Sequence, residues 1–434
     1  MVFDVWAAFL LNWQSPLSPM KRPPNLLWIV TTQWRAQACG YAGDPNARTP
    51  HLDALAVESV NYAQAVTPHP FGPFARAALL TGVLSPENGV RDYFDPLPVE
   101  ARTIAHELRA RGYATAFFGK WHLWKRDPAV PLVGEAHAQI VVPPEARGGF
   151  EFWEGFESGF LLNDPWLHGS HLPKPEKYSG YQSDIVCARA AQWMMENKNP
   201  KSKIENPSPW FCVVSLEAPH PPYGAPAAGV VARDPREIIL PPNVPRGGDA
   251  EVQTRRELAG YHAHLEATDR AVGRLVAGAS RADTVVVFTS VHGDMHGAHG
   301  LFRKGWPHEE SVRVPLLVRT PDEAPRRDEA AISLVDLPEL MLAKIEGRPA
   351  KIANECARLS MPSVVALPHQ CDRVWRGVRT PKRKLVLNDD GSPWLFYDLA
   401  RDPLEMNNLA GDPACAPEIA QLTAQCSGPQ RSGE

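Results

Sequence analysis

The stretch VVVFTSVHGDMHGAHGLFRKGWPHEESVRVPLLVR, residues 285–319, carries the clearest structural pattern in the chain. It begins and ends with short apolar runs, which are typical of strands buried in a sheet. Between them lies a segment rich in glycine and histidine, and glycine at that density favours a loop over a helix. The stretch therefore predicts two buried strands joined by a long loop that carries polar side chains, among them His292 and Lys304.

Outward from this stretch, apolar runs alternate with helical patterns. Further runs that predict buried strands are 25–30, 114–118 and 210–216, beside 284–289 and 314–318 of the first stretch, and the predicted helices are 52–57, 103–111, 185–195 and 255–276. This alternation predicts a doubly wound α/β fold, with a mainly parallel sheet flanked by helices and a ligand site beyond the carboxyl ends of the strands. Lys120, His220 and His292 each follow such a run. Two proline- and glycine-rich stretches, 141–149 and 221–248, are expected to be loops that cover the site.

Composition excludes several classes of protein. The 434 residues are 44% hydrophobic and 22% charged, as in ordinary globular proteins. A net charge of −4 without a long basic run predicts no nucleic-acid partner, and the lack of an apolar run of about twenty residues predicts no membrane span. Seven cysteines are odd in number and widely scattered, which indicates a reducing compartment and predicts a cytoplasmic protein. The oligomeric state is left open.

Several motifs carry a resemblance to a known family. FGPFARAALLTG, residues 71–82, resembles the signature of the sulfatases, a family of the alkaline-phosphatase superfamily: Cys or Ser, any residue, Pro, any residue, Arg, then a helix ending Leu-Leu-Thr-Gly. The family's other motifs are matched in order over nearly all of residues 24–413. They are PNLLWIVTTQWRAQACGYAG (24–43), GYATAFFGKWHLW (112–124), WFCVVSLEAPHPPY (210–223), the stretch 285–319 and LFYDLARDPLEMNNLAGDP (395–413).

The resemblance implies a domain plan. Residues 1–23 are an N-terminal extension, in which the lack of Lys or Arg before the apolar segment argues against a secretory signal and Met20 is a candidate true start. Residues 24–345 form the α/β domain, 346–425 a small antiparallel C-terminal subdomain, and 426–434 a tail. Short strands are predicted at 374–378, 384–387 and 394–399, and the chain after Cys415 is expected to be disordered.

The same resemblance implies that the catalytic centre is missing. In sulfatases the Cys or Ser of the signature becomes formylglycine, but that position is Gly72, which has no side chain to oxidise, and Phe74 replaces the signature proline. The family's metal-binding aspartates fall on Thr32, Gln33 and Val291, so that only His292 of the usual ligand set remains. Calcium prefers several anionic oxygens. The family's calcium is therefore predicted to be absent, and no cofactor is predicted.

The family's basic residues are retained. Arg76, Lys120, His122, His220 and Lys304 stand at positions that contact the substrate in sulfatases, and they predict a pocket for sulfate or another small sulfated or anionic ligand. The N-terminal amides of the helix after Gly72 would favour an anion at the same place. The alternative is that these basic side chains now pair with acids or cap loops.

Three functional hypotheses follow, and whether the protein is an enzyme is left open among them. The first is a catalytically degenerate sulfatase homologue that retains an anion pocket. The second is an active sulfate- or phosphate-ester hydrolase with a non-standard site, in which Glu217, His122 or His292 acts on water. The third is an interaction partner of an active paralogue.

Other residues suggest further metal ligands or nucleophiles. Asp294, Asp44 and Glu217 are the acids that could replace the lost metal ligands. The spacing of His292, His296 and His299 would suit zinc on a helix, but their glycine-rich surroundings favour a loop. Thr31 and Thr32 could be imagined as nucleophiles, and turn residues at a strand end are the favoured interpretation.

Overall fold

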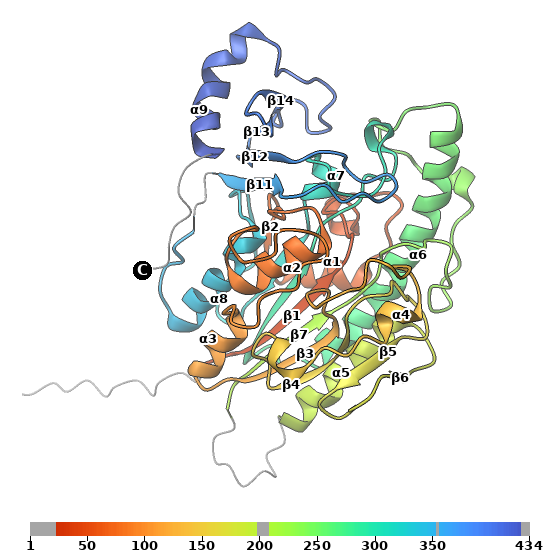
Figure 1. Cartoon of the computed structure of the whole chain (residues 1–434), viewed down its shortest axis with the longest axis vertical. Coiled ribbons are helices and arrows are strands. Elements are labelled where there is room, and N and C mark those ends of the chain that lie inside the picture. Colours follow the sequence, from red (N-terminus) through yellow and green to blue (C-terminus); the bar gives the residue numbers. More distant parts are fainter. Residues whose placement is uncertain (1–22, 198–207, 353–355, 427–434) are drawn as a thin grey trace, which may run out of the picture.

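A ten-stranded sheet forms the centre of the larger part of the molecule (Figure 1). The structure is a computed structural model that describes residues 23–197, 208–352 and 356–426. The strand order is β10-β2-β9-β8-β1-β7-β3-β4-β5-β6. Its five central strands run parallel, and they are β8 (Thr284–Ser290), β1 (Asn25–Thr31), β7 (Trp210–Ser215), β3 (Ala114–Lys120) and β4 (Phe152–Phe156). The predicted fold class is thereby confirmed.

The outer strands are partly antiparallel. They are β9 (Leu316–Arg319), β2 (Val60–Tyr62) and β10 (Arg326–Asp328) on one side, and β5 (Trp166–Gly169) and β6 (Glu176–Lys177) on the other. The expectation that residues 314–318 belong to the parallel set is wrong, because β9 pairs antiparallel with β8. Only the short helix α7 (Glu309–Val312) lies near the end of the connection from β8. Because no crossover helix connects the two strands, β9 begins at the same end of the sheet at which β8 finishes.

Helices cover both faces of the sheet. Leu26, Trp28 and Val30 of β1 face one core, to which α2 (Gly72–Thr81), α3 (Ile104–Ala110) and α8 (Leu337–Glu346) contribute. Leu27 and Ile29 face the other core, with α1 (Pro50–Val57), α5 (Gln182–Asn197) and α6 (Asp249–Ala277). A strand buried on both faces reads as a continuous apolar run, which explains why β1 was recognisable in the sequence.

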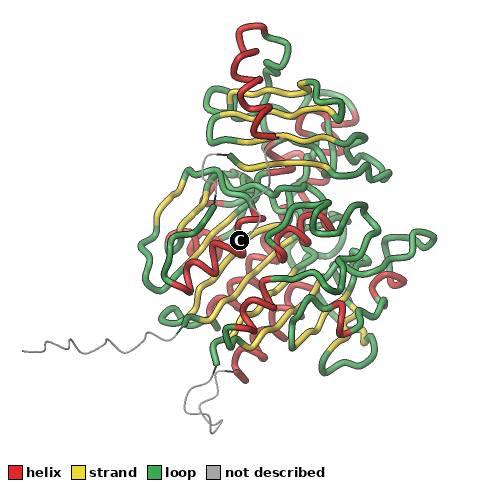
Figure 2. Tube along the Cα trace, turned by 60° about the vertical axis from the view of Figure 1, so that its left-hand side comes forward, coloured by secondary structure: helices red, strands yellow, loops and turns green. Residues whose placement is uncertain are grey.

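A second sheet lies at one end of the molecule (Figure 2). Its antiparallel strands are β11 (Ala357–Met361), β12 (Trp375–Arg379), β13 (Arg383–Asn388) and β14 (Pro393–Asp398). Strand β11 escaped the sequence prediction because its buried and half-buried residues alternate over only five positions. The expected disorder after Cys415 is wrong for α9 (Ala416–Cys426), since Ile419 and Leu422 lie on one side of the helix and pack against the small sheet. Residues 427–434 lie outside the described residues.

Buried ion pairs join the small sheet to the α/β domain. Lys384 Nζ of β13 lies 2.8 Å from Glu309 Oε1 and 2.7 Å from Glu405 Oε1. Arg379 Nη2 of β12 lies 3.0 Å from Glu309 Oε2. Glu309 begins α7, which directly precedes β9 of the large sheet, so both parts of the molecule contribute charge to one buried cluster.

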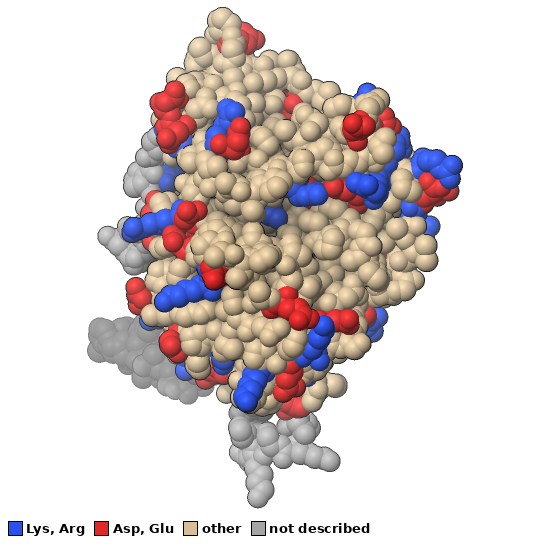
Figure 3. Space-filling view, turned by 45° about the vertical axis from the view of Figure 1, so that its right-hand side comes forward, with Lys and Arg blue, Asp and Glu red and all other residues tan. Residues whose placement is uncertain are grey.

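Other sequence expectations concern the surface and the chain ends. No helix within the described ranges is long and apolar enough to cross a membrane. On the face seen in Figure 3, Lys and Arg atoms alternate with Asp and Glu atoms, and no continuous basic surface crosses it. The predicted N-terminal extension falls, except for Pro23, outside the described residues, and with it the candidate start at Met20.

Candidate functional site

A cavity of about 520 Å³ opens where β1, β3, β7 and β8 end. Its polar floor comes from residues that follow these strands or begin α2: Thr32, Gly72, Lys120, His122, His220, His292 and Lys304. The walls are mostly apolar, and they consist of Phe71, Tyr93, Pro131, Leu132, Val133, Phe160, Pro221, Pro222, Leu367 and Pro368, with Arg303 and Gln370. The structure therefore brings four of the five predicted basic residues to one place.

The covering loops differ from those predicted. Pro221 and Pro222 come from the second predicted loop, but no residue of 141–149 is among the described residues that line the cavity. Val142 of that stretch is instead buried in the core. Residues 131–133 and 367–370 take its place, and no motif in the sequence marks them as part of a site.

Gly72 is the first residue of α2, and its missing side chain is replaced by a neighbour. A Cβ atom at Gly72 would lie 2.8 Å from Nδ1 and 3.1 Å from Cε1 of His122. The His122 ring is buried beside Tyr93 and Phe160, and neither ring nitrogen has a hydrogen-bond partner. Burial, helped by the positive charges of Lys120 and Arg126, lowers the pKa of His122 well below its ordinary value. The imidazole is therefore neutral and fills the place where a side chain at position 72 would begin.

Gly72→Ala should lower the free energy of unfolding by about 1–3 kcal/mol, because the new Cβ must push the His122 ring from its buried position. The matched control is Gly224→Ala, where an added Cβ meets no atom within 4 Å. Urea unfolding measures both variants, and Gly72→Ala should cost little when it is added to His122→Ala, which removes the ring that the new Cβ would displace. Equal tolerance of the two single variants would contradict this account.

Arg76 is the predicted site residue that does not line the cavity. Its Nη1 donates to Ser215 Oγ at 2.6 Å, and its Nη2 donates to Thr32 Oγ1 at 2.9 Å. Burial lowers the pKa of Arg76 to about 10, against the neighbouring negative charges. The guanidinium thus ties α2 to the ends of β1 and β7 and is not among the described residues that line the cavity. Its Nε has no hydrogen-bond partner among the described residues, and its contact with an anion stays a prediction.

Lys120 forms a buried pair with an acid. Its Nζ lies 2.7 Å from Glu217 Oε1, and both side chains are at most 1% exposed. Nζ also lies 4.5 Å from the centre of the Phe160 ring. Burial lowers the pKa of Lys120 to about 8, against the opposing effect of Glu217. Lys120 thus pairs with an acid and also lines the cavity.

Lys304 is held without an acid. Its Nζ donates to Gln33 Oε1 at 2.7 Å and lies 3.1 Å from His220 Nε2, and no carboxylate within the described part of the chain is in ion-pair distance. His220 Nδ1 lies 2.8 Å from Pro221 O, so Nδ1 carries the proton and Nε2 accepts from Lys304. Burial, together with the charges of Lys120 and Arg303 and against that of Asp294, lowers the pKa of Lys304 to about 7.

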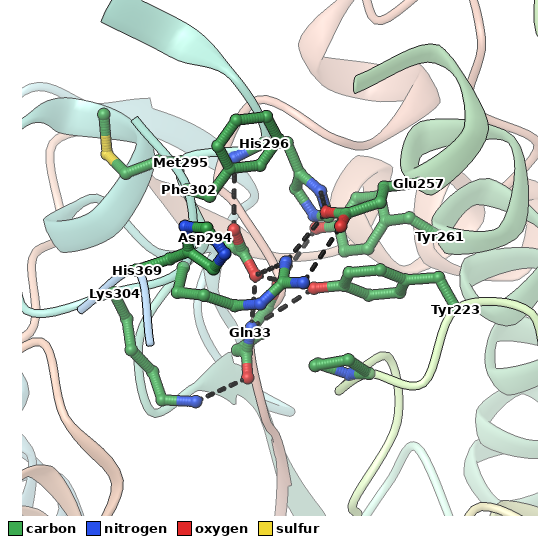
Figure 4. A network of polar contacts seen from close by, with 12 residues as sticks. Gln33, Tyr223, Glu257, Tyr261, Asp294, Met295, His296, Phe302, Lys304 and His369 are labelled. Carbon is green, nitrogen blue, oxygen red and sulfur yellow. Dashed lines mark hydrogen bonds and ion pairs between the residues drawn. The ribbon is translucent and has the colours of Figure 1, made fainter. Parts of the chain in front are cut away.

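Asp294 organises the layer beneath the floor (Figure 4). Its carboxylate accepts hydrogen bonds from Gln33 Nε2 and, at 2.6 Å, from Tyr223 Oη. Burial alone would raise the pKa of Asp294, but His296 and Arg303 hold it below the ordinary value. Gln33 therefore bonds to Asp294 on one side and to Lys304 on the other.

The three acids considered as replacement metal ligands all lie outside the cavity lining. Glu217 is paired with Lys120, and Asp294 with Gln33 and Tyr223. Asp44 Oδ2 lies 3.7 Å from His262 Nε2 on α6. None of the three is among the described residues that line the cavity, so the proposal that one of them rebuilds the metal site finds no support.

The residues at the predicted metal-ligand positions bond to other protein groups or lie in the core. Thr32 Oγ1 donates to Leu216 O at 2.9 Å and accepts from Arg76. Gln33 Oε1 accepts from Lys304, and Val291 is fully buried in the hydrophobic core. His292 Nδ1 lies 2.8 Å from Gly293 O, whereas its Nε2 has no partner and its side chain lines the cavity.

Three of the four histidines of the 285–319 stretch, His292, His296 and His299, do not converge. His292 lines the cavity, and His296 packs against the rings of Tyr223 and Tyr261. His299 stacks on His308 and belongs, with Glu310 and Glu405, to the one group of metal-capable side chains found among the described residues. The zinc interpretation is therefore wrong, because the segment is a loop rather than a helix.

The threonine interpretation also fails on geometry. Thr31 Oγ1 donates to Thr289 O at 3.1 Å within the sheet, and its side chain is fully buried. Thr32 Oγ1 faces Arg76 and no base. Both threonines thus satisfy backbone and side-chain groups at the end of β1.

Comparisons with known proteins agree with the motifs and the fold. The sulfatase family model matches residues 24–344. An ulvan-active sulfatase of Formosa agariphila is 33% identical over 418 residues, covering 90% of this chain and 78% of its own, and a choline-sulfatase of Rhizobium meliloti is 26% identical, covering 92% and 85%. The crystal structure of the YidJ protein of Bacteroides fragilis superposes with a TM-score of 0.80 at 26% identity, covering 94% of this chain and 96% of that one.

The family model covers well over half of the chain. The Formosa agariphila relative is 33% identical over an alignment that covers 90% of this chain. The order of the central strands places the matched motifs around one cavity. The chain belongs to the sulfatase family.

Proposed function

We propose that the protein is a catalytically degenerate sulfatase homologue that binds an anion without hydrolysing a sulfate ester. The observation that carries the proposal is Gly72, which offers no side chain as a nucleophile at the cavity floor and whose added Cβ would meet the His122 ring at 2.8 Å. Without a nucleophile, the covalent intermediate cannot form. What is left is a polar floor able to position a ligand.

The residues at the metal-ligand positions do not fit a divalent cation. Gln33 offers its amide oxygen to the Lys304 ammonium, and Thr32 offers its hydroxyl oxygen to Arg76. Both oxygens are thus already neighbours of a cationic group, and Val291 offers none. A hard cation needs several anionic oxygens and would be repelled by these charges. We therefore expect the protein to bind its ligand without the family's calcium.

The unpaired groups of the floor support anion binding. Lys304 has no acid partner among the described residues, and neither ring nitrogen of the neutral His122 has a hydrogen-bond partner, so that its N–H is free to donate. Gly72 begins α2, so amides at the N-terminus of a ten-residue helix lie at the same floor. Helix N-termini and lysine ammonium groups both favour anions. An anionic head group would satisfy these donors together.

Inorganic sulfate should bind to the protein, and Lys304→Met should weaken that binding at least about tenfold, because the one floor lysine without an acid partner is lost. Isothermal titration calorimetry at pH 6.5 measures both affinities. Lys174→Met is the matched control, since Lys174 is exposed and lies outside the cavity. Sulfate binding that survives Lys304→Met unchanged would place the anion elsewhere and refute the proposed site.

Hydrolysis of 4-nitrophenyl sulfate and 4-nitrophenyl phosphate should not exceed the rate in buffer, with or without added calcium, manganese or zinc. Loss of a nucleophile from a coupled catalytic unit costs on the order of a millionfold, and further losses in that unit add little. Release of 4-nitrophenolate measures the rate. Turnover that is abolished by Glu217→Gln or His292→Ala would instead establish the hydrolase with a non-standard site.

We also infer that the protein works in a reducing compartment such as the cytoplasm. All seven cysteines are described by the structure, and none forms a disulfide. Burial raises the pKa of Cys39, Cys187 and Cys371, so these thiols are protonated and unreactive. Thiol titration of the denatured protein, purified without reductant, should find seven free thiols, and fewer would oppose the inference.

A further inference from the structure

The walls of the cavity differ sharply from its floor. Deep in the cavity the walls are the buried rings of Phe71, Tyr93 and Phe160. Towards the opening they are leucine, valine and proline side chains, from Pro131, Leu132, Val133, Pro221, Pro222, Leu367 and Pro368. Val133 is 64% exposed although it is apolar. The cavity therefore combines an exposed apolar rim with buried aromatic rings beside the charged floor, where Phe160 stacks on His220 and lies 4.5 Å from Lys120 Nζ.

The polar groups of the walls are few and mostly engaged. Arg303 forms two bonds to Glu257, at 2.8 and 2.9 Å. Gln370 Oε1 accepts from the backbone of Lys304. A saccharide presents hydroxyl groups on every side, and each hydroxyl that loses water without a new partner costs free energy. These walls would leave most hydroxyls of a sulfated sugar without a partner.

The floor carries positive charge that no acid compensates. Lys120 is neutralised by Glu217, and Arg303 by Glu257. Lys304 has no acid in ion-pair distance within the described part of the chain. Arg76, behind the floor, keeps its charge as well, because its Nη1 and Nη2 are bonded to uncharged protein oxygens. Positive charge at the end of an apolar cavity matches a ligand with an anionic head and an apolar body.

We propose that the cavity binds an anion with an aromatic or aliphatic body, such as an aryl or alkyl sulfate or sulfonate, in preference to a sulfated saccharide. This proposal rests on the proposed function, because the anionic head occupies the same floor. The head group lies against Lys304, His122 and the first turn of α2. The body lies between Phe71, Tyr93 and Phe160 and extends to the leucine and proline rim. Bound intact, such a ligand needs neither nucleophile nor metal.

Four probes separate the contributions of head and body. Naphthalene-2-sulfonate carries both, naphthalene-2-sulfonamide carries the body without the charge, and inorganic sulfate carries the head alone. Glucose 6-sulfate carries the head on a hydroxyl-rich body. Titration calorimetry should find naphthalene-2-sulfonate bound at least about tenfold more tightly than each of the other three, because only it satisfies both floor and walls.

Wall variants locate the body. Leu367→Asn and Leu132→Asn keep the branched shape of the side chain but make it smaller and polar, and each should weaken naphthalene-2-sulfonate at least about threefold while leaving inorganic sulfate unchanged. The two residues come from different parts of the chain, so one remains informative if the other variant does not fold. Val231→Asn is the matched control, since Val231 is 88% exposed and lies outside the cavity lining.

The outcomes distinguish this proposal from the one on which it rests. Glucose 6-sulfate binding as tightly as naphthalene-2-sulfonate would overturn the preference for an apolar body and leave anion binding standing. Equal binding of the sulfonamide would refute the anion-binding function itself, as would a failure of every anionic probe to bind. Weakening by Val231→Asn equal to that by both wall variants would place the body outside this cavity.

Discussion

Glu217→Gln should lower the free energy of unfolding by about 3–5 kcal/mol, one of the two largest effects that we expect from a single substitution. The substitution leaves the Lys120 ammonium buried, with Nζ deprived of the carboxylate oxygen that now lies 2.7 Å away. The nearest other charge is positive, because Arg76 donates to the backbone oxygen of Lys120 itself. Urea unfolding followed by tryptophan fluorescence measures the change.

A double variant separates the broken pair from a damaged fold. Glu217→Gln combined with Lys120→Met removes both charges, and it should recover most of the loss because a buried pair replaced by neutral side chains is nearly neutral in stability. Glu196→Gln is the surface control, since Glu196 is exposed on α5. A loss below about 1 kcal/mol for Glu217→Gln would mean that water already reaches Lys120.

Lys384→Met should have an effect of similar size, about 3–5 kcal/mol, and it should act on the attachment of the small sheet. Lys384 is fully buried and neutralises Glu309 of α7 and Glu405 after β14. Without it, Glu309 keeps its pair with Arg379, but Glu405 stays buried with a hydrogen bond from the backbone N–H of Glu309 and no cation of its own among the described residues. Hydrogen exchange should therefore rise in β12, β13 and β14 more than in the central strands of the large sheet.

Lys382→Met is the matched control for Lys384→Met, because Lys382 lies two residues earlier and is exposed. It should leave both stability and exchange within about 0.5 kcal/mol of the native protein. Uniform loss of protection over both sheets in Lys384→Met would show that the cluster supports the whole fold rather than the attachment.

The parallel centre of the fold was predictable because burial on both faces leaves a simple signature. Strands β1, β3, β7 and β8 are continuous apolar runs, and helices separate them in the sequence. The direction of β9 was not predictable, because an apolar run has the same appearance in either orientation. Helix α9 was missed since only Ile419 and Leu422 of its eleven residues are buried.

The site was predictable where a motif fixes a residue to a strand end. Lys120, His122, His220 and Lys304 were placed correctly for this reason. The partners of these residues were not predictable, because hydrogen bonds such as that from Lys304 to Gln33 join residues 271 positions apart. Leu132 and Leu367 were missed, since a lone apolar residue in a loop carries no signal of the cavity that it faces.

The ring of His122 beside Gly72 has a consequence for the history of this sequence. Any exchange that gives position 72 a side chain, including the serine or cysteine of the family signature, must first contend with a buried imidazole 2.8 Å from the new Cβ. Substitutions at positions 72 and 122 should therefore depend on each other, because residues in contact seldom change independently. The size of the residue at one of these positions constrains which residues the other can carry.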